Sequence, residues 1–535
     1  MRIDEIRWTN YRRLADARLS VRGHLVLLGP NDSGKSSVLR AIHLCLGVPG
    51  TQLSSSVQPR DLTSPDQPLV LEVVLGDISH HDRAAFPDEI EIGPPETLTI
   101  RVEANVDPDD PTVVTVERGF PFAGHRRGVS RLQLQAIGWH FVAATRSMIR
   151  ELGTGSRGTA RELLMDLDLT DDEVTFNELA ERYRAALDGS TVIGDFRSSL
   201  ADALTDALPD AVHADDVGVS PATELSNSPL AGAAVTIRDG EHVAPIAEQS
   251  DGVRALTVLA LVGMANKAAR IVGIDEPETH LYPSAQRAVA ENLQRSEDQR
   301  IVATHSSAVV GRMSPLDIVA FGADRRARQL DVNAPIAMVE VSTRHWGHRM
   351  IEPLTANRIV VLEGPSDRIV CTRAAQLAGY NLDRAGITLF ELDGAEMFST
   401  ANRIFGAPGF DLPLYGLVDS DAADKWAKEL GIDRTALEAS NIIECVPDLE
   451  GAYVDALGVD RTVELLTATG FYTEQEIVRG CGVAMRAALT TDALADFCRH
   501  KRRKIPAALA ISGGMTQADA ASIEPVARLL KLACT

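Results

Sequence analysis

One segment of the sequence has the residues needed to hold a nucleotide phosphate. Residues 29–36 (GPNDSGKS) match the phosphate-binding loop pattern G-x-x-x-x-G-K-[ST]. The glycines of such a loop let backbone N–H groups approach the phosphates, and the start of the following helix favours negative charge. Lys35 is expected to bond the β- and γ-phosphates, and the Ser36 hydroxyl to ligate Mg²⁺. The residues expected to contact ATP here are Gly29, Asn31, Ser33, Gly34, Lys35, Ser36 and Ser37.

A pair of carboxylates follows a second apolar segment. The strand expected at residues 270–274 runs into Asp275 and Glu276. In P-loop ATPases an aspartate at this point holds the Mg²⁺ shell, and a glutamate polarises the attacking water. An acidic pair after a strand is also common as a helix cap. The segment PETHL directly after the pair, and His305 at the end of the next expected strand, make the ATPase interpretation specific.

Another set of carboxylates lies in the last third of the chain. One apolar strand ends at Glu363, and Asp367 follows at the start of a helix. A later apolar strand runs into Asp419 and Asp421. Alternate residues of a strand project from one face, so these two aspartates can share a cation if the strand continues that far. Oxygen ligands without His or Cys favour Mg²⁺ or Mn²⁺ over zinc. The alternative is that the aspartates form a turn and Glu363 caps a helix.

The elements around these residues alternate between strands and helices, which predicts an α/β fold. Apolar runs at residues 25–28, 69–75 and 97–103 are expected to be strands. From about residue 155 the pattern becomes helical and acidic, and strand signals resume near residue 233. We expect an ATPase domain in two parts, at residues 1–154 and 233–350. A helical insertion at 155–232 separates the two parts, and a second α/β domain follows at 351–535.

With its motifs in this order, the first domain resembles ABC-type ATPases of the SMC-like, RecF-like branch. The resemblance implies that Ser250 and Gly252 contact the γ-phosphate of a nucleotide held by a partner copy, and that His305 senses the same phosphate. It therefore implies a homodimer with nucleotides between the two heads. Residues 249–253 (QSDGV) depart from the common L-S-G-G-Q signature. Residues 60–61 (Arg-Asp) are a candidate for the Q-loop.

The second domain resembles the Toprim fold, in which a Glu-Gly motif, here Glu363 and Gly364, precedes an Asp-x-Asp motif. An ABC ATPase followed by Toprim is the arrangement of the OLD (overcoming lysogenization defect) family of nucleases, and the resemblance covers nearly the whole chain. It implies cleavage of DNA with paired divalent cations, and dimerisation through the helical insertion. It also extends to a role in phage defence or DNA processing, and to a separate helicase partner.

Residue by residue, the OLD resemblance implies a set of metal ligands in the second domain. The ligands are Glu363, which is also placed in the catalytic set, Asp367, Asp419, Asp421 and Glu450. A lysine near the C-terminus would stabilise the charged transition state, with Lys504 as the candidate and Lys501 as its competitor. The main alternative function is a nucleotide-gated sensor that binds DNA or a partner without nuclease turnover. RNA is an alternative substrate.

Composition limits these interpretations only in part. The formal net charge is −22, which argues against a nucleic-acid partner unless positive charge is concentrated locally. Three basic clusters occur, at residues 125–127, 325–328 and 500–504, and each is either a solvated face or part of a site. The six cysteines are scattered without a CxxC pair, which predicts reduced thiols and no structural zinc. With no segment apolar enough to span a bilayer, we expect a cytoplasmic protein without a membrane partner.

Overall fold

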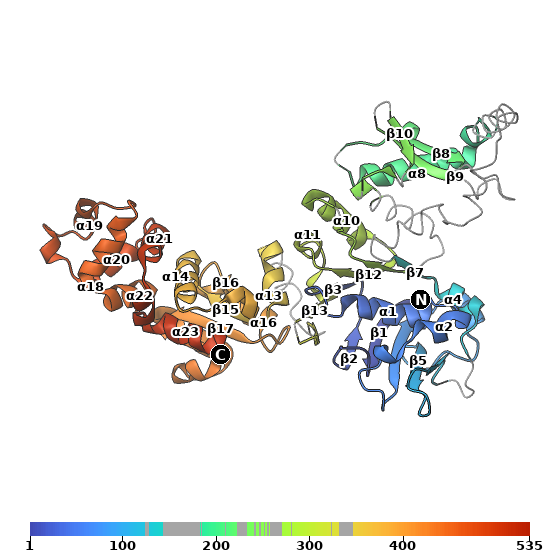
Figure 1. Cartoon of the computed structure of the whole chain (residues 1–535), viewed down its shortest axis with the longest axis horizontal. Helices are drawn as coiled ribbons and strands as arrows, with labels where there is room; N and C mark the ends of the chain where they lie inside the picture. The colour runs from blue at the N-terminus through green and yellow to red at the C-terminus, as the bar shows by residue number, and fades with distance from the viewer. Residues whose placement is uncertain are drawn as a thin grey trace. The chain divides into compact units, whose positions relative to one another are not determined.

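The computed structural model describes residues 1–122, 128–142, 182, 185–208, 210–221, 233–239, 242–245, 248–250, 252–253, 256, 270–279, 281–322, 324–330 and 346–535. These residues form two compact units (Figure 1). The first comprises Met1–Val319 with Arg325–Ala327, and the second comprises Ala320–Asp324 with Arg328–Thr535.

A six-stranded sheet has the order β14-β13-β3-β12-β11-β7. Its strands are β3 (Leu25–Leu28), β7 (Trp139–Val142), β11 (Ile271–Asp275), β12 (Gln299–Thr304), β13 (Ile318–Phe321) and β14 (Ala327–Gln329). Strands β3, β12, β11 and β7 run parallel. Every residue of β3 and β12 is buried. Their continuous apolar runs are therefore typical of parallel strands that are covered on both faces.

An antiparallel sheet in the order β2-β1-β4-β5-β6 completes the main core of the first unit. Its strands are β1 (Arg2–Thr9), β2 (Ala17–Ser20), β4 (Leu69–Gly76), β5 (Leu98–Val106) and β6 (Val114–Gly119). Helix α1 (Lys35–Leu46) contacts β4 and β5 of this sheet and β7, β11 and β12 of the parallel one. The strands expected at 25–28, 69–75 and 97–103 are thus confirmed, and packing on both sides fixes the position of α1.

Shorter elements fill the rest of the described first unit. Helices α2 (Gly50–Ser56), α3 (His80–Ala85), α4 (Arg131–Ile137), α10 (Pro283–Arg295) and α11 (Ser307–Val310) accompany the 3₁₀ turns η1 (Pro59–Asp61) and η4 (Pro315–Asp317). Most of the insertion expected at 155–232 lies outside the described residues. Its described part includes α8 (Thr191–Thr205) and η2 (Ala214–Asp216).

The described part of that insertion is not purely helical, contrary to the expectation. Strand β8 (Val217–Pro221) pairs with β9 (Ala233–Asp239), which pairs with β10 (His242–Pro245) in an antiparallel sheet. The alternation of Val217 and Val219 with small residues suits a strand better than a helix. No helix among the described residues has both the length and the apolar character needed to cross a membrane.

The second unit is built on a parallel sheet in the order β16-β15-β17-β18. Its strands are β15 (Arg358–Leu362), β16 (Ile387–Glu391), β17 (Leu414–Asp419) and β18 (Ile442–Cys445). Its helices are α13 (Ile351–Thr355), α14 (Pro365–Leu377), α15 (Leu382–Ala385), α16 (Phe398–Phe405), α17 (Ser420–Leu430), α18 (Leu449–Ala468), α19 (Glu474–Gly480), α20 (Thr491–Arg499), α21 (Lys504–Gly514), α22 (Gln517–Ser522) and α23 (Glu524–Cys534). The 3₁₀ turns of this unit are η5 (Gly347–Met350), η6 (Ala395–Met397), η7 (Arg434–Ala436), η8 (Glu438–Ser440) and η9 (Arg486–Ala488).

Alternate residues of these strands face different helices. Val360, Leu362 and Leu417 belong to a core cluster shared with α14, α18, α21 and α23. A Cβ on Gly416 would instead meet Trp426 of α17 at 2.9 Å. Because neighbouring residues of a strand point to opposite faces, the sheet is covered on both sides. This leaves the carboxyl ends of the strands as the place for chemistry.

Candidate active sites

The phosphate-binding loop connects β3 to α1 in the conformation that its glycines allow. Gly34 has a φ of 110°, and a Cβ at this position would lie 2.2 Å from a methyl carbon of Leu14. Lys35 is buried, and its Nζ donates to the carbonyl oxygens of Gly29 and Pro30 at 2.8 Å each. Burial lowers the pKa of the Lys35 ammonium. The Ser33 hydroxyl is buried with no hydrogen-bond partner among the described residues, which leaves it free for a phosphate oxygen.

Two residues predicted to hold Mg²⁺ meet beside this loop. Ser36 lies in the first turn of α1, and Asp275 ends β11. The Ser36 hydroxyl donates to Asp275 Oδ1 at 3.1 Å. Burial raises the pKa of the Asp275 carboxyl. A hydroxyl and a carboxylate in contact at the start of a phosphate loop suit a Mg²⁺ ion that bridges them to a nucleotide.

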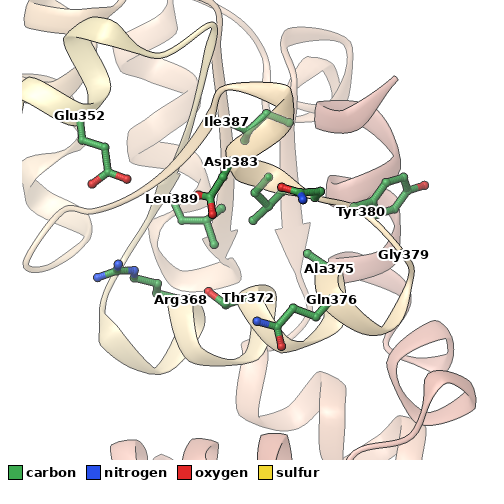
Figure 2. A pocket seen from close by; sticks show the side chains of 12 residues that line it. Glu352, Arg368, Thr372, Ala375, Gln376, Gly379, Tyr380, Asp383, Ile387 and Leu389 are labelled. Carbon is green, nitrogen blue, oxygen red and sulfur yellow. The ribbon is translucent and has the colours of Figure 1, made fainter. Parts of the chain in front are cut away.

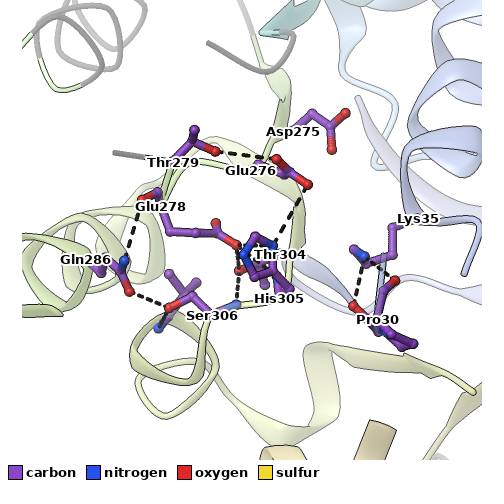
Figure 3. A network of polar contacts seen from close by, with 12 residues as sticks. Pro30, Lys35, Asp275, Glu276, Glu278, Thr279, Gln286, Thr304, His305 and Ser306 are labelled. Atoms are coloured by element: carbon purple, nitrogen blue, oxygen red, sulfur yellow. Dashed lines mark hydrogen bonds and ion pairs between the residues drawn. The ribbon is translucent and has the colours of Figure 1, made fainter. Parts of the chain in front are cut away.

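A polar network links the glutamates after β11 to the end of β12 (Figure 3). Glu278 Oε1 accepts the Thr304 hydroxyl at 2.7 Å and the backbone N–H of His305 at 2.8 Å. The same oxygen lies 3.3 Å from His305 Nδ1, whereas Glu276 Oε1 lies 3.8 Å from it. Glu276, with a φ of 50°, lies at the turn after the strand. The network therefore brings together the predicted water-polarising glutamate and the predicted sensor histidine.

Glu278 is a residue whose role the sequence did not reveal. Its side chain is 3% exposed, and its Oε2 has no hydrogen-bond partner among the described residues. Since its Oε1 accepts the backbone N–H of His305 and faces Nδ1 of the ring, Glu278 helps to hold this histidine in position. Spacing alone offered no signal for this role, because a glutamate in a surface loop ordinarily faces solvent.

The remaining predicted ATP-site residues are less tightly constrained. Asn31 and Ser250 are exposed, and the Ser250 hydroxyl accepts the backbone N–H of Val253 at 3.4 Å. Gly252 lies at the start of a helical segment, and residue 251 lies outside the described residues.

An ion pair and a hydrogen bond through Arg12 hold Asp61 of the Q-loop candidate in place. Asp61 accepts from Arg12 Nε at 2.8 Å, and Arg12 Nη1 donates to the Ser37 hydroxyl at 3.1 Å. Arg12 thus joins Asp61 to the first turn of α1.

The carboxylates of the second unit meet at one pocket of about 720 Å³. We call it the carboxylate pocket, and its lining includes Glu363, Asp419, Asp421, Glu450 and Lys504. Each acid lies where a strand or loop meets the start of a helix. Glu363 precedes α14, Asp419 caps α17, Asp421 lies in the first turn of α17, and Glu450 lies in the first turn of α18. The carboxyl edge of the parallel sheet therefore gathers the acids, as expected for this fold class.

Backbone hydrogen bonds hold the acids in place. The N–H of Asp419 donates to Glu363 Oε1 at 3.1 Å, and the N–H of Leu449 donates to Asp419 Oδ1 at 3.1 Å. The predicted ligand Asp367 is 4% exposed, and its Oδ2 accepts the N–H of Gly364 at 3.0 Å. Strand β17 is thereby tied to the starts of both α14 and α18.

The expected geometry of Asp419 and Asp421 is wrong in one respect. Strand β17 ends at Asp419, and Asp421 belongs to α17, so the two side chains do not alternate on a strand face. Asp419 caps the helix with extended backbone angles, and the chain turns helical at Ser420. The two aspartates still line the same pocket. Glu363 is not a helix cap, because Gly364 occupies that position for α14.

Burial and mutual repulsion give this pocket its electrostatic character. Burial, reinforced by the carboxylates of Glu363 and Asp367, raises the pKa of Asp419 to about 8. Burial likewise raises the pKa of Glu450 to about 7, although Lys504 opposes the shift. Glu450 Oε1 has no hydrogen-bond partner within the described residues, and Oε2 faces Lys504 Nζ at 3.3 Å. Such a set of acids is stabilised by cations, and oxygen donors suit Mg²⁺ or Mn²⁺.

The side chains are close to, but not at, the geometry of a metal site. Nowhere in the described ranges do three or more His, Cys, Asp or Glu side chains already have an arrangement that would hold an ion. The donor set fits a pair of divalent cations in type and number, and all six cysteines are free thiols.

The basic residues of the pocket are Lys504 and Arg499. Lys504 Nζ lies 3.3 Å from Glu450 Oε2, and the neighbouring carboxylates raise the pKa of Lys504 despite its burial. Lys501 is exposed and does not line the pocket. The structure thus brings Lys504, rather than Lys501, to the carboxylates. Arg499 was not predicted, and its Nη2 donates to Asp448 Oδ1 at 3.1 Å.

A second pocket of the same unit, of about 460 Å³, lies along the outer face of α14 (Figure 2). Arg368, Thr372 and Gln376 of α14 line one side, and residues of α15 and β16 line another. None of the predicted site residues lines it.

Two family models match the chain. The AAA domain model AAA_21, whose description also names the AbiEii toxin of type IV toxin–antitoxin systems, matches residues 154–311. The Toprim domain model of overcoming lysogenization defect-like proteins matches residues 354–421. The first match includes Ser250, Asp275 and His305, and the second includes the acids from Glu363 to Asp421.

Several solved structures resemble parts of the chain. The C-terminal region of the Burkholderia pseudomallei OLD protein is 19% identical, with 33% of this chain and 96% of that chain covered and a TM-score of 0.27. The C-terminal region of the Xanthomonas campestris pv. campestris OLD protein is 18% identical, with 34% of this chain and 94% of that chain covered and a TM-score of 0.28. An Smc head bound to the C-terminal winged-helix domain of ScpA is 18% identical, with 61% of this chain and 97% of that chain covered and a TM-score of 0.40. No curated protein matches the chain.

Proposed function

We propose that this chain, which joins a P-loop ATPase domain to a Toprim domain of the OLD type, hydrolyses ATP and cuts DNA with divalent cations. The observation that carries the nuclease proposal is the carboxylate pocket, where four predicted ligands and Lys504 line one cavity. The pocket lies at the carboxyl edge of a parallel sheet, where open α/β folds bind ligands.

In the first unit, the proposed roles follow from the contacts around the phosphate loop. Lys35 would hold the β- and γ-phosphates, and Ser36 with Asp275 would hold Mg²⁺. Glu276 would orient and polarise the attacking water, because it is the partly exposed acid beside His305. Glu278 would act through His305 as a positioning residue, since it contacts both the backbone and the ring of that histidine.

In the second unit, Glu363, Asp367, Asp419, Asp421 and Glu450 would hold two divalent cations. Bound cations would supply Lewis-acid stabilisation of the attacking and leaving oxygens. Lys504 offers a positive charge without coordinating, and would stabilise the additional negative charge of the phosphorane-like transition state. Its ion pair with Glu450 keeps its ammonium inside the pocket.

We further propose a homodimer in which Ser250 and Gly252 of one copy face the nucleotide of the other, with the insertion at 155–232 contributing to dimerisation. The exposure of Ser250 suits a contact across an interface. A helicase partner and a role in phage defence or DNA processing remain compatible with this arrangement.

The test is cleavage of supercoiled plasmid by the purified full chain in Mg²⁺ or Mn²⁺, with and without ATP. We expect nicked or linear product that requires the metal, together with phosphate release from ATP. Absence of cleavage of both DNA and RNA, with ATP hydrolysis intact, would leave the nucleotide-gated sensor as the function. Cleavage of RNA alone would change the substrate class.

A further inference from the structure

The three basic clusters of the sequence have different surroundings. In the cluster at 325–328, Arg325 pairs with Asp32 at 3.1 Å and Arg328 pairs with Asp324 at 2.6 Å. The cluster at 125–127 lies outside the described residues. The third cluster forms the connection between α20 and α21, residues 500–503, which we call the α20–α21 turn.

Two cations of the α20–α21 turn have no acidic partner. Within the described ranges, no carboxylate forms an ion pair with Lys501 or Arg502, and both side chains are exposed. The flanking cations Arg499 and Lys504 are instead paired with Asp448 and Glu450. In a chain of net charge −22, two adjacent cations without acidic partners are not explained by neutralisation of neighbouring acids.

The turn lies at the edge of the carboxylate pocket. Arg499 and Lys504, which flank the turn, both line the pocket, so the turn connects two residues of its lining. The lining contains eight carboxylates and only these two cations. Even two divalent ions would not fully offset that formal charge. A phosphodiester chain that reaches the pocket therefore needs positive charge supplied from outside its lining.

Packing keeps the turn in one conformation. The N–H groups of Arg503 and Lys504 both donate to the carbonyl oxygen of His500, at 2.7 and 3.0 Å. The Arg503 guanidinium lies 4.3 Å above the Phe497 ring, and the Arg503 carbonyl accepts the Tyr472 hydroxyl at 3.4 Å. The Arg503 side chain therefore packs against Phe497 and does not extend toward an external ligand. Lys501 and Arg502 remain for an external ligand, on a backbone that is already ordered.

We propose that Lys501 and Arg502 bind backbone phosphates of the DNA next to the one that is cut, and so hold the duplex across the carboxylate pocket. This inference rests on the proposed nuclease function and deepens it. Exposed cations on a fixed turn contact phosphates without reading bases. They therefore supply affinity and register, while Lys504 acts on the reacting phosphate.

The experiment measures binding of a fluorescent DNA duplex to the full chain in Ca²⁺ as a function of salt. In the Lys501→Ala/Arg502→Ala double variant we expect the slope of log affinity against log salt to fall by about 2, since each lost phosphate contact removes about 0.9. Affinity near 0.1 M salt should fall about tenfold to a hundredfold. Cleavage at saturating DNA should stay within about twofold of the parent, because the lost interaction is one of uniform binding.

The matched control is Arg384→Ala/Lys531→Ala, which removes two exposed cations of the same unit that do not line the pocket. This control should keep the parental slope. A parental slope and affinity in the Lys501→Ala/Arg502→Ala variant, from a parent that cuts DNA, would overturn the inference alone. A parent that neither binds nor cuts DNA would overturn the proposed function as well. Parental cleavage at saturating DNA by both double variants would show that the second unit is folded.

Discussion

The two candidate sites handle negative charge in opposite ways. At the phosphate loop, the protein offers donors: the buried Lys35 ammonium and the Ser33 hydroxyl, which has no hydrogen-bond partner among the described residues. In the carboxylate pocket, burial and neighbouring acids raise the pKa of Asp419 to about 8, and one lysine opposes them. The first site suits an anionic ligand, whereas the second suits cations. Substitutions in one should therefore leave the chemistry of the other intact.

The largest effect is expected at Asp419, which contacts both the α14 and the α18 sides of the pocket. Asp419→Ala should lower metal-dependent DNA cleavage at least about 10³-fold, because the cations and the charge of the transition state lose a central ligand. ATP hydrolysis should stay near the parental rate. Plasmid nicking and phosphate release measured on one preparation test the split, and persistent nicking would refute the Toprim assignment.

The reciprocal variant is Glu276→Gln. ATP should still bind, but hydrolysis should fall about 10²- to 10⁴-fold, because the amide cannot polarise the attacking water. Single-turnover phosphate release with a parallel nucleotide-binding measurement separates the two effects. Lys35→Ala is the control that should lose binding itself. Parental hydrolysis by Glu276→Gln would make this glutamate structural.

Lys504→Ala tests the role of the lysine in the carboxylate pocket. Cleavage should fall about 10²- to 10³-fold while binding of Mn²⁺ is preserved, because the ammonium adds charge without coordinating. Calorimetric titration with Mn²⁺ beside the nicking assay gives both values. If Mn²⁺ binding is lost together with cleavage, Lys504 supports the ligand set and does not act on the substrate.

Glu278→Ala should have a smaller effect on the ATPase. We expect kcat for ATP hydrolysis to fall about tenfold to a hundredfold with KM nearly unchanged, because His305 loses the carboxylate that orients it. Glu278→Gln should recover much of the rate, since its amide oxygen still accepts from Thr304 and from the His305 backbone. Equal losses in both variants would mean that the charge of Glu278, not its hydrogen bonds, matters.

The smallest effect lies outside both sites and concerns stability. Burial raises the pKa of Asp317 to about 6, against the guanidinium groups of Arg22 and Arg2. A carboxyl whose pKa is higher in the folded state destabilises the fold at pH values above that pKa, and the penalty fades as the pH falls toward 3.8. Asp317→Asn should therefore raise the unfolding midpoint at pH 8 by a few degrees and by less at pH 5. Equal gains at both values would exclude a charge effect.

The sequence predicted the positions of the phosphate loop and of the acids in the fold better than the residues that support them. The phosphate loop, Asp275 and the acid at Glu363 follow apolar strands with no alternation, and buried parallel strands leave few alternatives for where such residues emerge. The domain pair is matched by the two family models. These parts of the fold depend mainly on local sequence.

What could not be predicted depends on single-residue details of tertiary packing. The end of β17 at Asp419, two residues before Asp421, decides that Asp421 is carried by a helix. The start of α21 at Lys504 decides which lysine enters the pocket. Glu278 is buried only because β12 ends beside it. Strand β8 pairs with β9, the next strand of the chain, and its short alternation of Val217 and Val219 was missed within a segment expected to be helical.

The attachment of the pocket acids to helix starts has a consequence for how the site attracts a phosphate. Helices α14, α17 and α18 all begin at this pocket; α14 and α17 span 13 and 11 residues, and α18 is interrupted at Gly458, which has a φ of 73°. Aligned peptide dipoles give each helix start roughly half a unit of positive charge. That charge belongs to the backbone and survives every side-chain substitution. A variant without the basic side chains of the pocket would therefore still attract anions weakly. Only disruption of the first helical turns would abolish that attraction.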